Sequence, residues 1–102
     1  MIYAVLIRRL RPDATFEQFR QAWLPDQRFE IPVNVANARR VDDPRELLSL
    51  GRADISGAQV PEFLERVAAS EALRHDRIAD VIEVTVHTGI YEVVSEDELG
   101  TI

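Results

Sequence analysis

The stretch IYAVLIRR, residues 2 to 9, decides the fold of this 102-residue chain. It is a nearly continuous apolar run with β-branched and aromatic members, a pattern typical of a strand that is buried on both faces. A strand of this kind lies in the middle of a sheet. We therefore expect the remaining strands to be arranged around it.

A helix is predicted directly after this strand. Thr15, with Gln18 three residues later, forms a capping-box signature for a helix that begins at Phe16. Large rings recur at helical spacing and place one face of the helix on the sheet: Phe16, Phe19 and Trp23. Pro25 disfavours helical geometry at the residue before it, so the helix is expected to end near Leu24.

A hairpin is predicted after the first helix. Residues 26 to 32 indicate a loop, and residues 33 to 41, VNVANARRV, indicate a strand with small and polar residues interleaved. The tripeptide DDP at residues 42 to 44 supplies turn chemistry, and the chain returns as a strand over residues 46 to 55, ELLSLGRADI. Gly51 is expected to mark a bulge in that strand.

A second helix and a final strand complete the pattern. The helix begins around Val60, with Pro61 at a position that suits the first helical turn. Ser70 is expected to cap a further short helical turn that runs through Leu73. Residues 83 to 94, EVTVHTGIYEVV, have the alternation and β-branched content of a strand. The apolar face of the helix is predicted to consist of Phe63, Leu64, Val67 and Ala68.

The resulting order of elements is strand, helix, strand, strand, helix, strand. Right-handed crossovers then favour a ferredoxin-like α+β sandwich of βαββαβ order, with a four-stranded antiparallel sheet that carries both helices on one face. The length fits a single domain over residues 1 to 102. The second face of the sheet is also expected to be apolar, because Tyr91 and Val93 of the last strand add to the apolar first strand. Face-to-face pairing with a second copy would cover it in a homodimer.

The composition excludes several classes of function. The chain has no cysteine and no lysine, which excludes thiolate metal sites, thiol nucleophiles, Schiff-base chemistry and a phosphate-loop lysine. Its net charge is −6 with dispersed acids, so no nucleic-acid partner is expected. Residues 2 to 7 form the longest apolar stretch, which falls far short of the roughly 20 residues of a membrane span. We expect a cytoplasmic protein without a signal segment or membrane contact.

Two basic clusters interrupt the acidic background. Arg8 and Arg9 lie close to Arg11, and Arg39 is followed by Arg40. We interpret both clusters as solvated strand ends with nearby carboxylates. Binding of an anionic small ligand is the alternative at either cluster.

The chain resembles the dimeric α+β barrel superfamily, which includes cofactor-independent antibiotic-biosynthesis monooxygenases, haem-degrading monooxygenases, ethyl tert-butyl ether degradation-type proteins and stress-responsive barrel proteins. The resemblance spans nearly the whole chain and rests on four patterns: IYAVLIRRL from residue 2, TFEQFRQAW from residue 15, FLERVAASEALRH from residue 63 and IYEVV from residue 90. It implies the barrel fold, a homodimer and a monooxygenase-like activity that needs no cofactor. Of the residues associated with haem degradation, His75 alone matches in kind.

Candidate catalytic residues lie on the final strand. Counting alternate positions places Thr85, His87 and Tyr91 on one face, toward the barrel. There His87 could act as a general base near neutral pH, and Tyr91 could orient a phenol or an enolate. Alternatively, His87 is a satisfied interior or edge residue and Tyr91 an interface anchor. A bulge at Gly89 would break the grouping. The apolar set expected to meet the helices is Val84, Val86 and Ile90.

Four further residues are predicted to bind substrate. Arg52 and Asp54 share a face of the third strand and could form an anion clamp with its orienting carboxylate, or pair only with each other. Asn37 is the candidate on the second strand, and Tyr3, which could equally be a core aromatic, is the candidate on the first. His75 lacks partners at metal-site spacing, so we interpret it as a helix-terminus histidine that interacts with the helix dipole. No metal site is expected.

Two functions remain open at this point. The first is a small enzyme, such as a cofactor-independent monooxygenase, an isomerase or a cyclase, acting on a hydrophobic or aromatic molecule inside the barrel. Such chemistry requires mainly desolvation and one well-placed acid-base group. The second is a non-catalytic dimer, either a small-molecule-binding or a stress-related protein, whose barrel is filled by its own side chains. RNA recognition is set aside because the third strand carries no aromatic residue.

Overall fold

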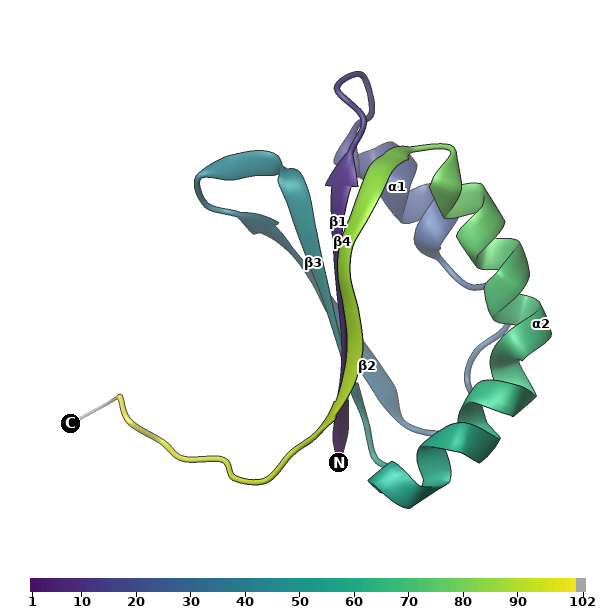
Figure 1. The fold of residues 1–102 in the computed structure, drawn as a ribbon, viewed down its shortest axis with the longest axis vertical. Helices are drawn as coiled ribbons and strands as arrows, with labels where there is room; N and C mark the ends of the chain where they lie inside the picture. The colour runs from purple at the N-terminus through teal and green to yellow at the C-terminus, as the bar shows by residue number, and fades with distance from the viewer. Residues whose placement is uncertain (101–102) are drawn as a thin grey trace.

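The computed structural model describes residues 1–100 and contains one four-stranded antiparallel sheet with two helices on one face (Figure 1). The order of the strands in the sheet is β2-β3-β1-β4. The expected βαββαβ, ferredoxin-like arrangement is therefore confirmed, with β1 in the interior of the sheet. The elements are β1 (Ile2–Leu10), α1 (Phe16–Trp23), β2 (Val33–Arg40), β3 (Asp43–Ala53), a 3₁₀ turn (Gly57–Gln59), α2 (Val60–Ala79) and β4 (Ile82–Glu92).

The capping box of α1 forms as the sequence indicates. The backbone N–H of Gln18 donates to Oγ1 of Thr15 at 3.1 Å, and the N–H of Thr15 donates to Oε1 of Gln18 at 2.9 Å. The two bonds satisfy backbone donors that the first turn of a helix leaves unpaired. The helix thereby directs Phe19 into the core, where that side chain is fully buried.

The core between the sheet and the helices consists of two clusters. Because β1 runs from Ile2 to Leu10 and each cluster contains one of these residues, the clusters lie at opposite ends of the sheet. The middle of the sheet is therefore packed less fully than its ends. The first cluster consists of Leu10, Phe19, Leu47 and Ile78, and the second of Ile2, Ala53 and Ile55.

The strand β3 differs from the expectation in two ways. It begins at Asp43, because the hairpin turn is confined to residues 41–42, and its first residues pair with the end of β2 across a register shift. Pro44 lies in this irregular region, where a missing N–H costs the ladder little. The expected bulge at Gly51 is absent: Gly51 pairs in register with Ala4 on one side and Val35 on the other.

The second helix is longer than the sequence predicted. The helix α2 continues for 20 residues through Ser70, which does not start a new turn. After Pro61 the helical segment contains no glycine or proline, and an interior serine is tolerated when tertiary packing holds the helix. Phe63, Leu64 and Val67 of the predicted apolar face line the cavity between α2 and the sheet, although Leu64 is 45% exposed, whereas Ala68 is exposed and corrects that prediction. No helix within residues 1–100 is sufficiently long and apolar to span a bilayer.

A register shift in β4 places residues on opposite faces of the sheet that simple alternation along the strand would place on the same face. Ile7 of β1 pairs with His87, but the next residue, Arg8, pairs with Thr85, which leaves Val86 as an extra residue in β4. The bulge therefore lies at Val86. It separates Thr85, which turns toward the helices, from His87, which turns away from them.

The remaining residues of β4 follow from this register. Gly89 pairs in register with Val5, so no bulge forms there, and Tyr91 pairs with Tyr3. Ile90 points toward the helices as expected. The expectation that Val84 also points toward the helices is wrong, because Val84 pairs with Arg9 and lies on the face opposite to the helices.

The face of the sheet opposite to the helices, here called the open face, is covered by no helix or strand of residues 1–100 (Figure 1). Alternation along the strands places both apolar and polar side chains on it. Residues 93–100, which follow β4, leave the sheet on this side (Figure 1). The open face carries Tyr3, Val5, Ile7, Leu48, Leu50, Arg52, His87 and Tyr91.

Candidate functional site

A cavity of about 220 Å³ lies between α2 and the middle of the sheet, in the space that the two core clusters leave. All four strands contribute to its lining, and so do α1, α2 and the loop between α1 and β2. Most of the walls are apolar, and a few polar side chains converge at one end. An apolar hollow with a small number of polar groups is typical of a site for a small molecule. The apolar lining includes Leu6, Trp23, Phe29, Val35, Phe63 and Val67.

Small residues on the central strands create this room. Ala4 of β1 lies directly opposite Gly51 of β3, and both side-chain positions point toward α2. A Cβ atom added to Gly51 would meet the Cβ of Ala4 and Cγ2 of Val35 at 3.7 Å, an ordinary van der Waals distance. Space for a larger side chain is therefore left empty between the sheet and the helix.

The sheet supplies polar groups at the polar end of the cavity: Ser49 lines the cavity itself, and Arg8 lines an adjoining hollow. Arg8 of β1 is 3% exposed, and its Nη1 donates to Oγ of Ser49 at 3.4 Å. The hydroxyl of Ser49 in turn donates to Oδ1 of Asn37 at 2.6 Å. The guanidinium of Arg8 also lies 5.6 Å from the centroid of the Phe19 ring. This chain of contacts fixes a buried cation in the sheet beneath α2.

The helix α2 supplies the other polar groups. Arg74 is 9% exposed, and its Nη2 donates to Oε2 of Glu71 at 2.9 Å. The guanidinium of Arg74 lies 5.6 Å from the centroid of the Trp23 ring. Nε2 of His75 is 3.6 Å from Oε2 of Glu71. Because residues 71, 74 and 75 are spaced by three and four, one face of the helix presents them all to the cavity.

Burial shifts the ionisation of these groups. The pKa of Arg8 is lowered to about 10, chiefly by burial and also by the positive charge of Arg74, while the carboxylate of Glu71 opposes the shift. Burial also lowers the pKa of Arg74, while the neighbouring carboxylate of Glu71 raises it. The pKa of His75 is lowered from 6.5, chiefly by burial. At neutral pH the polar end therefore holds two cations, one carboxylate and a neutral imidazole.

Two hollows adjoin the cavity. One of about 430 Å³ shares Trp23, Phe29 and Arg74 with it and extends along the loop between α1 and β2. The other, of about 290 Å³, shares His75 with the cavity and reaches Arg8. The polar end is thus accessible from more than one side.

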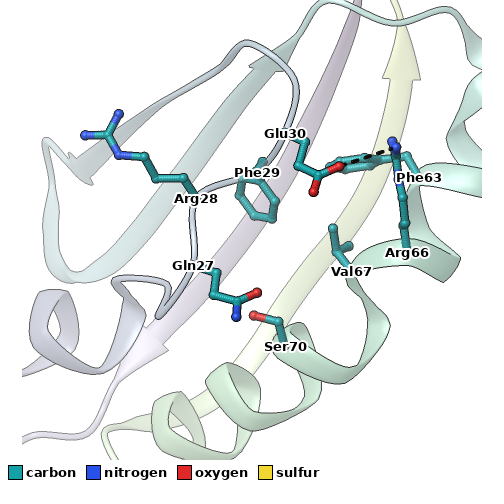
Figure 2. A pocket seen from close by; sticks show the side chains of 8 residues that line it. All are labelled: Gln27, Arg28, Phe29, Glu30, Phe63, Arg66, Val67 and Ser70. Atoms are coloured by element: carbon teal, nitrogen blue, oxygen red, sulfur yellow. Dashed lines mark ion pairs between the residues drawn. The ribbon is translucent and has the colours of Figure 1, made fainter.

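The loop between α1 and β2 packs on α2 (Figure 2) and contributes Phe29 to the lining of the cavity. The rings of Phe29 and Phe63 meet edge to face, with centroids 5.7 Å apart and planes at 60°. Outside them, Arg66 and Glu30 form an exposed ion pair at 3.8 Å. Phe29 lines both the cavity and an outer pocket of about 100 Å³. The side chain of Phe29 is therefore part of the wall between the cavity and the surface.

The predicted catalytic pair, His87 and Tyr91, lies on the open face. Nε2 of His87 is 2.6 Å from the hydroxyl oxygen of Tyr91, and the two rings are stacked with centroids 6.2 Å apart. Tyr3 is the cross-strand neighbour of Tyr91 and also of Arg52. The guanidinium of Arg52 lies 5.6 Å from the centroid of the Tyr3 ring. The structure therefore brings four of the predicted site residues together on this face.

The other predicted residues lie apart from that group. Asp54 follows the end of β3 and is exposed, and its backbone N–H donates to the carbonyl of Pro32. The ion pair of Arg52 is formed with Glu96, at 3.5 Å. Asn37 belongs to the helix side, in the hydrogen-bonded chain of Arg8.

Sequence reasoning missed the polar end of the cavity. The solvated strand end expected at Arg8 is not formed, because strict alternation from Ile2 to Leu10 places Arg8 on the helix side, where it is buried. The spacing of Glu71 and Arg74 was available in the sequence, but the expected interruption at Ser70 concealed their shared face. His75 lies four residues before the end of α2, and its side chain also lines the cavity, which the interpretation as a helix-terminus histidine did not include.

Residues 1–100 contain no cluster of three or more histidine, cysteine, aspartate or glutamate side chains that could hold a metal ion. The polar groups at the cavity are dominated by arginine, which carries a fixed positive charge and does not favour a second cation nearby.

Comparison with known proteins identifies the fold. No family model and no curated protein matches the chain. A proposed antibiotic biosynthesis monooxygenase from Chloroflexus aurantiacus J-10-fl has a similar structure, with a TM-score of 0.65, 15% identity and coverage of 98% of this chain and 100% of that chain. Another from Nitrosomonas europaea has a TM-score of 0.59, 16% identity and coverage of 93% and 100%. This chain therefore has the ferredoxin-like α+β fold that its resemblance to the dimeric α+β barrel superfamily implied.

Proposed function

We propose that the protein is a small-molecule enzyme whose substrate, hydrophobic or aromatic, binds in the cavity beneath α2 and reacts by proton abstraction, with molecular oxygen as the oxidant. The observation that carries the proposal is the combination of apolar walls with two buried arginines, Arg8 and Arg74, beside the half-buried Glu71 and the more exposed His75. Perturbed titratable groups that converge in one hollow are characteristic of catalytic sites.

Each polar group has a role in this chemistry. His75 is neutral at neutral pH, so its imidazole can accept a proton from a C–H or O–H group of the substrate. The oxyanion that develops is stabilised by the fixed charges of Arg8 and Arg74 in surroundings of low dielectric constant. The apolar walls bind the hydrophobic or aromatic body of the substrate.

The oxidation is balanced without a cofactor. After loss of the proton to His75, the substrate carbanion gives two electrons to O₂ and forms a carbon–oxygen bond, and the resulting peroxide anion takes the proton back from His75 to become a hydroperoxide. Loss of water from the hydroperoxide leaves a carbonyl group, so that CH₂ and O₂ become C=O and H₂O. Both structural neighbours carry the name of monooxygenases, which supports this class of reaction.

The proposal includes a homodimer formed through the open face. Its support is the set of apolar side chains in the middle of that face, which a monomer would leave in water: Val5, Ile7, Leu48 and Leu50. In such a dimer the hydrogen-bonded pair of His87 and Tyr91 would lie between two sheets. This pair is then a second candidate acid-base group, with Tyr3 and Arg52 beside it.

Oxygen consumption tests the proposed reaction. The protein is incubated with phenols, hydroquinones and 1,3-diketones that fit the cavity, and O₂ uptake is measured together with formation of the oxidised product. His75→Gln is expected to lower the rate at least 100-fold, whereas the control Leu73→Gln, on the exposed side of α2, is expected to retain it. Equal rates in wild type and His75→Gln would refute the role of His75. Binding without turnover would favour a small-molecule-binding protein.

A further inference from the structure

The polar end of the cavity carries more positive than negative charge. Arg8 and Arg74 both line the connected hollows, and each is more than nine-tenths buried. The nearby carboxylate is Glu71, whose Oε2 accepts the hydrogen bond from Arg74. Since His75 is neutral at neutral pH, the cluster has a surplus of one positive charge.

The surplus of positive charge is located mainly on Arg8. Within residues 1–100, no carboxylate forms an ion pair with Arg8, and its neutral partner Ser49 leaves the charge of the guanidinium uncompensated. An uncompensated buried charge is costly, and proteins rarely keep one without a partner. Arg8 and Arg74 also repel each other. A negatively charged ligand between them would remove both penalties.

Two buried polar atoms of this cluster also lack partners. Nε of Arg74 and Oε1 of Glu71 are buried and have no hydrogen-bond partner within the described residues. Nε is a donor that matches an oxygen anion, and guanidinium groups bind carboxylates with paired N–H donors. Oε1 of Glu71 would accept from a hydroxyl or from a protonated group on the same ligand.

The lining of the cavity indicates the size and polarity of the rest of the ligand. The aromatic ring of Trp23 and the side chains of Phe29 and Phe63 surround the apolar part of the cavity. Its volume of about 220 Å³ is suited to a compact molecule, such as one with a single ring. An apolar body at one end and an anionic group at the other would satisfy both halves of the site.

We infer that the cavity binds small carboxylates, or other oxygen anions, that carry a compact apolar body, and that Arg8 and Arg74 hold the anionic group. This inference rests on the cavity being the substrate site of the proposed function, but not on the reaction that takes place there. It narrows the substrate class from hydrophobic molecules in general to anionic ones.

The test compares an acid with its neutral isostere. Phenylacetate and phenylacetamide have similar size and shape, and neither absorbs at the 295 nm used to excite tryptophan. Trp23 is the single tryptophan of the chain and lines the cavity, so its fluorescence reports binding of either probe. We expect phenylacetate to bind at least 10-fold more tightly than phenylacetamide at pH 7.

Substitution of Arg8 and Arg74 tests whether these two arginines cause the preference for the acid over the amide. Arg8→Met and Arg74→Met are expected to reduce the ratio of the two affinities at least 10-fold, mostly through weaker binding of the acid. Arg20→Met is the matched control, because Arg20 is exposed on α1, and it should leave the ratio unchanged. Circular dichroism of each variant confirms that it is folded.

A third variant is expected to strengthen binding, so its result cannot be explained by loss of folding. Glu71→Gln removes the carboxylate that competes for Arg74 and increases the surplus of positive charge. It should tighten binding of phenylacetate several-fold with little effect on phenylacetamide. No loss of function is needed for this result, so misfolding cannot imitate it.

The outcomes separate the inference from the proposed reaction. Equal affinities for acid and amide, absence of binding by both, or a ratio unchanged in Arg8→Met and Arg74→Met would each overturn the inference. A clear preference for the acid without any oxygen consumption by anionic substrates would support the inference and refute the reaction. Oxygen consumption with neutral substrates alone would support the reaction and refute the inference.

Discussion

Ala4 and Gly51 face each other across β1 and β3, directly beneath α2, and neither has a side chain long enough to reach the helix. This pair keeps the cavity open, since the core clusters on either side of it are packed by large side chains. The volume available to a ligand is therefore encoded in two small residues of the sheet.

Enlarging Gly51 should close the cavity without unfolding the protein. Gly51→Leu places four carbon atoms in empty, apolar space, so we expect an unchanged or higher melting temperature and at least 10-fold weaker binding of phenylacetate. Gly51→Ala is the control, because its added Cβ would lie at ordinary contact distance from its neighbours. Retained binding in Gly51→Leu would show that the ligand binds elsewhere.

Removing the cap of α1 should destabilise the fold. Thr15→Ala leaves the N–H of Gln18 without its acceptor, which we expect to lower the free energy of unfolding by about 1 kcal/mol. Urea denaturation followed by circular dichroism measures the change. Thr15→Ser retains the acceptor oxygen and should recover most of the loss. Identical midpoints for Thr15→Ala and wild type would contradict the importance of the cap.

The ionisation of His75 should be visible in the pH dependence of stability. Its pKa in the folded state is below 6.5, so in the interval just below pH 6.5 the unfolded chain binds more protons than the folded chain. Stability should therefore fall as the pH decreases below about 6.5, with no contribution from His75 above it. NMR titration of its ring protons should give a midpoint below 6.5. The variant His75→Gln should show a flatter stability profile in this interval.

Substitutions on the open face test the second candidate site. If the pair of His87 and Tyr91 participates in acid-base chemistry, His87→Ala and Tyr91→Phe should each lower turnover, by a factor on the order of 100 or more. Asn34→Ala, on the same face of the outer strand β2, serves as the control. Unchanged turnover in both variants would remove the pair from the mechanism and leave the cavity beneath α2 as the catalytic site.

The proposed dimer depends on the apolar centre of the open face. Leu50→Glu introduces a charge there and should convert the dimer to a monomer, because burial of an unpaired carboxylate opposes association. Light scattering after gel filtration gives the mass directly. Leu73→Glu, on the exposed side of α2, should leave the mass unchanged. A wild-type protein that is already monomeric at micromolar concentration would rule out this interface.

Features that depend on neighbouring residues in the chain were predictable from the sequence. The capping box of Thr15 and Gln18 is a local hydrogen-bonding pattern, and it formed as expected. The order of the elements followed from the periodicity of apolar residues and from turn chemistry. The central position of β1 followed from its apolar character on both faces.

Features that depend on pairing between distant segments were not predictable in this way. The bulge at Val86 is set by the pairing of β4 with β1, and one extra residue was enough to separate Thr85 from His87. The continuation of α2 through Ser70 depends on packing against the sheet. Because Arg8 and Arg74 come from segments 66 positions apart in the sequence, their convergence became visible only in the folded chain.

The loop that carries Phe29 belongs to neither the sheet nor the helices, although it forms a wall of the cavity. Core residues such as Phe19 are constrained by packing on every side, whereas a loop tolerates substitution and changes of length. Natural variation in this loop could alter which molecules reach the arginines without disturbing the arginines themselves. In the proposed enzyme, selectivity and chemistry would thus be encoded in separate segments, which would give this small scaffold a route to new substrates at little cost in stability.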